Sequence, residues 1–158
     1  MNECSILPAR EAAINPQPVQ TNPPHRILVV EDDEDIRRLN TEVLIRHGYQ
    51  VDAAEDGAVA WDALQLNRYD LIVTDNAMPK VTGVELLEKL HAAQMELPVI
   101  IATGSSPKLK FTRQPWLRPA AMVLKPYTID ELLMTVMEVL RGTANTINRG
   151  QDNPSCAR

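Results

Sequence analysis

Short apolar runs alternate with helical patterns along the middle of the chain. The apolar runs lie at residues 26–30, 49–54, 70–75, 98–103 and 120–125, and helical periodicity appears at 34–48, 57–67, 83–93 and 128–142. Nearly continuous apolar strands that alternate with helices are typical of a parallel sheet covered on both faces. The pattern therefore predicts an α/β fold in which helices pack on both faces of a five-stranded parallel sheet.

The segment at 128–142 gives the clearest helix prediction. Its apolar residues recur at helical spacing: Ile129, Leu132, Leu133, Val136, Met137 and Leu140. Thr128 and Glu131 have the spacing of a capping box, and Gly142 predicts the end of the helix. In the helix at 34–48, the residues Ile36, Leu39, Val43 and Leu44 are expected on one helical face. Asp56 is the expected N-cap of the helix at 57–67.

The two ends of the chain differ from the middle. Residues 1–25 are rich in proline, and residues 142–158 are polar and almost without large apolar groups. Such segments bury too little apolar surface to order themselves, so we expect disordered tails on both sides of a folded domain at 26–141. A chain of 158 residues is long enough for one domain with its own core.

Composition narrows the class of protein. The two cysteines, Cys4 and Cys156, stand in the terminal segments without metal or disulfide spacing, which favours a reducing, cytoplasmic compartment. No apolar stretch approaches the roughly 20 residues of a membrane span. A net charge of -5 argues against nucleic-acid binding, although basic residues alternate with aromatic ones at 108–118. We expect that segment to be a solvated or protein-docking surface.

Polar residues stand at the carboxyl ends of four of the five predicted strands. These residues are Glu31, Asp32 and Asp33 on the first strand, Asp75 on the third, Thr103 on the fourth and Lys125 on the fifth. Each alone is explained as the first solvated residue after a strand, and the charges at 33–35 also suit a helix start. Sites of parallel α/β sheets form at these strand ends, so four polar ends together predict a site.

The residue types at this edge suit phosphoryl transfer. One lysine cannot neutralise three carboxylates, whereas Mg²⁺ can, and no His or Cys is placed to favour zinc. An aspartate can act as the nucleophile towards phosphorus. A cation and a lysine can neutralise the charge on the phosphoryl oxygens, and a threonine hydroxyl can donate a hydrogen bond to one of them.

Four motifs make the chain resemble the receiver domain of two-component response regulators. They are "ILVVEDD" (27–33), "DLIVTDNAMPKVTG" (70–83), "PVIIATG" (98–104) and "LKP" (124–126), and together the resemblance covers residues 26 to about 141. The resemblance implies a flavodoxin-like sheet with strand order 2-1-3-4-5. It implies Asp75 as phosphoacceptor and as a ligand of Mg²⁺, together with Glu31, Asp32 and the Ala77 backbone carbonyl. Thr103 and Lys125 would contact the phosphoryl group.

Two departures from the family pattern affect the expected switch. The family often has an aromatic residue three positions before the lysine, where this chain has Met122, so an aromatic rotamer switch is not expected. The segment at 105–119, where the family has its fourth helix, contains Pro107, Pro115 and Pro119. Because proline interrupts a helix, we expect this fourth helix to be short or irregular.

The resemblance also implies partners and leaves alternatives. A histidine kinase or a histidine phosphotransfer protein would donate the phosphoryl group, and an unidentified protein would read the result. With no output domain visible, we expect a stand-alone receiver, and a phosphorelay shuttle or phosphate sink remains an alternative. A receiver-like interaction module that is not phosphorylated is a second. A haloacid-dehalogenase-like phosphatase is a third, but it needs an Asp where Ala77 stands.

Overall fold

A single parallel sheet forms the centre of the molecule. We analysed a computed structural model, which describes residues 24–104 and 114–149. Its strands are β1 (Arg26–Val30), β2 (Gln50–Ala54), β3 (Leu71–Asp75), β4 (Val99–Thr103) and β5 (Ala121–Leu124). They lie in the order β2-β1-β3-β4-β5, and all four neighbouring pairs are parallel. The predicted fold class and strand order are confirmed.

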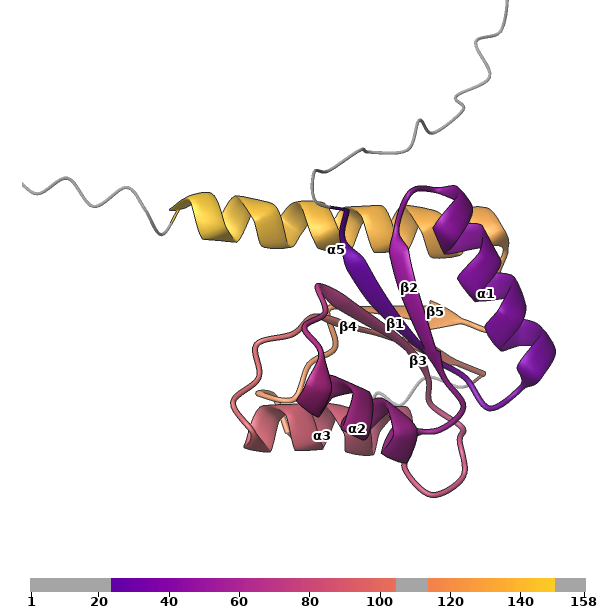
Figure 1. The fold of residues 1–158 in the computed structure, drawn as a ribbon. Coiled ribbons are helices and arrows are strands. Elements are labelled where there is room, and N and C mark those ends of the chain that lie inside the picture. The colour runs from indigo at the N-terminus through magenta and orange to yellow at the C-terminus, as the bar shows by residue number, and fades with distance from the viewer. Residues whose placement is uncertain (1–23, 105–113, 150–158) are drawn as a thin grey trace, which may run out of the picture.

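Helices cover both faces of this sheet (Figure 1). They are α1 (Glu34–Arg46), α2 (Gly57–Leu66), α3 (Gly83–Ala92) and α5 (Ile129–Arg149). One buried apolar cluster joins α1 and α5 to the sheet, and a second joins α2 and α3 to its other face. β3 and β4 are buried along their whole length because they lie between these two layers. None of the helices in the described ranges is both long and apolar enough to cross a bilayer.

Side-chain caps start the helices where the sequence predicts. Asp33 caps α1, its Oδ1 accepting the amides of Asp35 at 3.0 Å and Ile36 at 3.1 Å. Asp56 caps α2, as expected. Thr128 and Glu131 form the predicted capping box before α5, since each side chain accepts the other residue's backbone N–H. These caps fix the points at which the chain turns from strand to helix.

One local prediction is wrong. Gly142 does not end the last helix, because α5 continues to Arg149, and the segment predicted as a polar tail from residue 142 therefore begins inside a helix. A glycine stops a helix when it takes a left-handed backbone, as Gly48 does after α1 with φ of 88°, and Gly142 does not. On the predicted apolar face of α1, Val43 and Leu44 are buried, whereas Leu39 is 48% exposed.

The connection between β4 and β5 is described only in part. Residues 105–113, which hold most of the predicted fourth helix, lie outside the described residues, and 114–120 contain neither helix nor strand. The short or irregular fourth helix thus stays a prediction.

Candidate functional site

Three carboxylates meet where β1 and β3 end. Val30 and Thr74 are paired in register, so the residues that follow them, Glu31 with Asp32 and Asp75, lie side by side. One carboxylate oxygen from each of the three lies within 4.8 Å of the others. Glu31 and Asp75 are only 3% and 6% exposed, whereas Asp32 is exposed. The structure brings together the three acidic residues that the sequence singles out.

Lys125 lies against two of these carboxylates. Its Nζ donates to Glu31 Oε2 at 3.1 Å and lies 3.3 Å from Asp75 Oδ1. β4 and β5 place it there: Thr103 pairs in register with Leu124, and the Lys125 N–H donates to the Thr103 carbonyl at 2.9 Å. Thr103 is 3% exposed at the end of β4. The peptide bond after Lys125, to Pro126, is cis.

Burial and charge shift the pKa values of this pair. Burial raises the pKa of Glu31, and the charge of Asp75 adds to that rise, while the hydrogen bond from Lys125 only partly opposes it. For Lys125, burial is the largest effect and would lower the pKa, but the hydrogen bond and charge of Glu31, with Asp75, together raise it. Lys125 is therefore held in its protonated form beside the Glu31 carboxylate.

The backbone that carries the acidic pair is held by α1. The Arg37 guanidinium donates to the Glu31 carbonyl at 2.8 Å and to the Asp32 carbonyl at 3.3 Å. The Asp33 N–H also donates to Glu31 Oε1 at 3.3 Å. Sequence analysis did not identify Arg37, because an arginine in the first turns of an amphipathic helix has no pattern that distinguishes it from a solvated one.

The loop between β3 and α3, residues 76–82, starts at Asp75 and contains Ala77. The Asn76 N–H donates to the Ala102 carbonyl at 2.9 Å, and the Asn76 side chain accepts from the Val84 N–H at 3.3 Å. Ala77 is exposed two residues after Asp75. Met122 lies apart from this loop, half-buried on β5 and in register with Ile101.

The arrangement fits a hard divalent cation. Three carboxylates face one ammonium group, which leaves net negative charge, and the available ligand atoms are oxygens of the kind that Mg²⁺ prefers. Asp32 is exposed and so leaves the cluster open to water and to a substrate.

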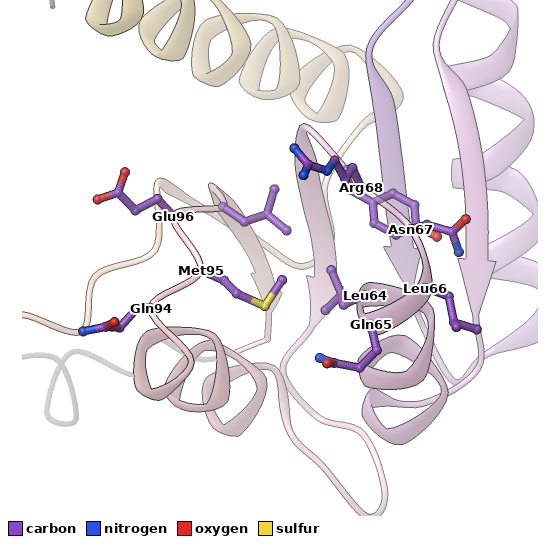
Figure 2. Close-up of a pocket in the computed structure, with 10 residues that line it drawn as sticks. Leu64, Gln65, Leu66, Asn67, Arg68, Gln94, Met95 and Glu96 are labelled. Carbon is purple, nitrogen blue, oxygen red and sulfur yellow. The ribbon is translucent and has the colours of Figure 1, made fainter.

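An open groove of about 680 Å³ lies elsewhere, between the ends of α2 and α3. Figure 2 shows Leu64 of α2 facing Met95 in the turn after α3. Tyr69, which also lines this groove, precedes β3, whereas Asp75 ends that strand. The groove therefore lies at the opposite end of the sheet from the acidic cluster and is no part of that site.

Comparisons with known proteins agree on one family. Residues 27–137 match the family model of the response regulator receiver domain. Response regulator MprA of Mycobacterium sp. (strain KMS) is 34% identical over 134 residues, which are 84% of this chain and 56% of MprA. Response regulator receiver protein CpdR of Brucella abortus (strain 2308) is 30% identical over 115 residues, 73% of this chain and 96% of CpdR. The chain spans about half the length of the first curated relatives it matches.

Solved structures show the same fold. The receiver domain of the Francisella response regulator 1452 superposes with a TM-score of 0.69 at 28% identity, covering 75% of this chain and 98% of that one. TrrA from Thermotoga maritima, solved in complex with Mg²⁺ and BeF, gives 0.63 at 31% identity, covering 73% and 98%. The fold, the acidic cluster and the family match lead to one conclusion: the chain belongs to the response regulator receiver domain family.

Proposed function

We propose that Asp75 accepts a phosphoryl group from a histidine kinase or a histidine phosphotransfer protein, in a reaction that depends on Mg²⁺. The observation that carries this proposal is the acidic cluster itself, with three carboxylate oxygens within 4.8 Å and Lys125 3.3 Å from the Asp75 carboxylate. We place the exchange in the cytoplasm, since the cysteines show no disulfide pattern.

The chemistry follows from what surrounds Asp75. A carboxylate oxygen of Asp75 forms a bond to phosphorus while the phosphorus–nitrogen bond of the donor phosphohistidine breaks, and the imidazole keeps that electron pair. Lys125 is positioned to pair with a phosphoryl oxygen, because its ammonium group already lies beside the attacking carboxylate. Bound Mg²⁺ would neutralise charge on the transferring group. The protein would catalyse only its own phosphorylation and dephosphorylation.

The two acids on β1 receive different roles. Asp32 is exposed, so its carboxylate is available as a direct ligand of the cation. Glu31 is buried and hydrogen-bonded to Lys125, which suits contact with the cation through water. The Ala77 carbonyl completes the proposed ligand set.

Thr103 is the residue that we propose connects phosphorylation with output. It ends β4 beside the strand that carries Lys125, and its hydroxyl would move towards a phosphoryl oxygen. A shift of Thr103 would displace the connection between β4 and β5, which begins at the next residue. Output is then a changed protein-binding surface.

Labelling with acetyl phosphate or a purified histidine kinase tests the acceptor. Asp75→Asn should abolish Mg²⁺-dependent incorporation of phosphate, because the amide cannot form the acyl phosphate. Asp62→Asn is the matched control, since Asp62 is an exposed acid on α2 and should label like the wild type. Persistent labelling of the Asp75→Asn protein would contradict the assignment, and a wild type that never labels would favour an unphosphorylated interaction module.

A further inference from the structure

The far side of the β3–α3 loop, residues 79–82, is joined to the N-cap residue of α2 by an ion pair. Lys80 Nζ donates to Asp56 Oδ2 at 2.7 Å, across 24 positions of sequence. The near side of the same loop contains Ala77, whose carbonyl we place around the cation. A contact that fixes the path of this loop therefore also affects the position of the Ala77 carbonyl.

Asp56 is an unusually well-fixed partner for an exposed lysine. Its side chain is 5% exposed, whereas that of Lys80 is 68% exposed. The other carboxylate oxygen, Oδ1, accepts the amides of Ala58 and Val59, each at 2.9 Å. The Lys80 hydrogen bond and these amides lower the pKa of Asp56, which keeps it ionised. Ion pairs between two mobile surface side chains contribute little to stability. Here, however, the Asp56 carboxylate is held by two backbone amides.

The backbone of the loop needs such a restraint. Lys80 has a left-handed backbone, with φ of 67°, which non-glycine residues adopt only when their surroundings enforce it. Next to it, Val81 is packed directly on α2: a Cβ added at Gly57 would stand 2.6 Å from the Val81 Cβ. The loop thus packs closely on the start of α2, and the Lys80–Asp56 ion pair joins it to the same place.

We propose that the Lys80–Asp56 pair, called the latch below, positions the β3–α3 loop for Mg²⁺ binding. This inference rests on the proposed function. Lys80 acts here as a positioning residue, through the backbone of Ala77, and contacts neither the cation nor the phosphoryl group.

The charge of Lys80 alone predicts that its removal changes Mg²⁺ affinity in the direction opposite to that expected from the latch. Removing a cationic side chain makes the surroundings more negative, which by itself strengthens binding of a divalent cation. If the latch positions the loop, removing Lys80 weakens Mg²⁺ binding despite that gain. The direction of the change therefore separates positioning from simple electrostatics.

Calorimetric titration of the full chain with Mg²⁺ tests the latch. Lys80→Asn removes the ion pair and keeps a residue that tolerates the left-handed backbone. We expect its dissociation constant for Mg²⁺ to rise about threefold to tenfold, towards the low end of the effects of outer-shell changes at metal sites. Labelling at saturating Mg²⁺ should stay near the wild-type rate, and Lys80→Arg should restore Mg²⁺ binding. Arg68→Gln removes another exposed charge and should bind Mg²⁺ like the wild type.

A double variant completes the test. Asp56→Asn keeps an N-cap for α2 but loses the charged partner. Under the latch, Asp56→Asn/Lys80→Asn binds Mg²⁺ more weakly than the wild type and with an affinity between those of the single variants, because each substitution removes the same restraint while their charge effects oppose each other. Wild-type affinity in the double variant would mean that opposite charge effects cancel, and would overturn the latch. Unchanged or tighter binding by Lys80→Asn would overturn it too, while leaving wild-type phosphorylation intact. A wild type that does not bind Mg²⁺ would overturn both proposals.

Discussion

Individual charged residues are balanced differently at the two ends of the sheet. At the amino end, the Asp52 carboxylate accepts hydrogen bonds from Arg26 at 2.6 Å and from the Tyr69 hydroxyl at 2.7 Å, and Arg26 also lies over the Tyr69 ring. At the carboxyl end, the three acids exceed the single lysine. Asp52 is thus paired with protein groups, whereas the carboxyl end is suited to an added cation.

Tyr69 gives this local balance a measurable pH dependence. Burial, then the hydrogen bond to Asp52, raises the pKa of Tyr69 to about 12. The neutral phenol is therefore favoured by folding, and its contribution to stability is complete below pH 10 and is lost as pH rises through about 12. Because Tyr69 is partly exposed, we expect this loss to be about 1–2 kcal/mol.

Urea unfolding of wild type and Tyr69→Phe at several alkaline pH values measures this effect. The variant is expected to be less stable near neutral pH, since Asp52 loses a donor, but to lose less stability between pH 10 and 12. Parallel pH profiles of the two proteins would show that Tyr69 does not carry the effect.

Two glycines in different helices differ in the space that surrounds them. A Cβ at Gly83, in the first turn of α3, would stand 2.7 Å from the Asp75 carbonyl oxygen, whereas a Cβ at Gly142, inside α5, would have nothing within 4 Å. The start of α3 therefore approaches the backbone of the proposed acceptor so closely that only glycine fits.

Alanine substitutions at these positions form a matched pair. Gly83→Ala should destabilise the protein by about 1–3 kcal/mol through overpacking, and should slow labelling of Asp75 as its backbone shifts. Gly142→Ala should stabilise it by about 0.5–1 kcal/mol, because alanine loses less conformational freedom in a helix. Thermal unfolding measures the stability of the two variants, and acetyl phosphate labelling measures the phosphorylation of Asp75. Equal effects of the two substitutions would contradict the packing argument.

At the scale of helices and strands, sequence patterns predict some boundaries and contacts but not others. Each strand was predicted to within one residue at either end, because continuous apolar runs bounded by polar residues mark buried parallel strands. The end of α5 was predicted incorrectly, because a glycine ends a helix through its backbone conformation, and the residue type alone does not show that conformation. Asp56 was predicted as a cap, but its pairing with Lys80 depends on the path of a loop, which carries no periodic signal.

At the scale of the whole molecule, two apolar layers share one sheet. Residues of β1, such as Leu28 and Val29, contribute alternately to the layer under α2 and α3 and to the layer under α1 and α5. Neither layer can be lost without exposing the same strands, so the domain should unfold as one cooperative unit.

Two probes of unfolding test this cooperativity. Trp61 packs on the layer under α2 and α3, and Trp116 lines a small pocket with Leu87 and Leu90 of α3, so fluorescence reports this side of the sheet. Far-ultraviolet circular dichroism reports all helices. The two urea transitions should coincide. A fluorescence transition at lower urea would show that the α2–α3 side opens first.

The turn after α3 has a practical use in protein engineering. Gln94 is exposed there with a left-handed backbone, φ of 54°, at the end of the sheet farthest from Asp75. Exposed turns accept inserted sequence more readily than strands or helices do. A reporter peptide or a second small domain could therefore be grafted at this turn, and the acidic cluster at the other end would keep its surroundings.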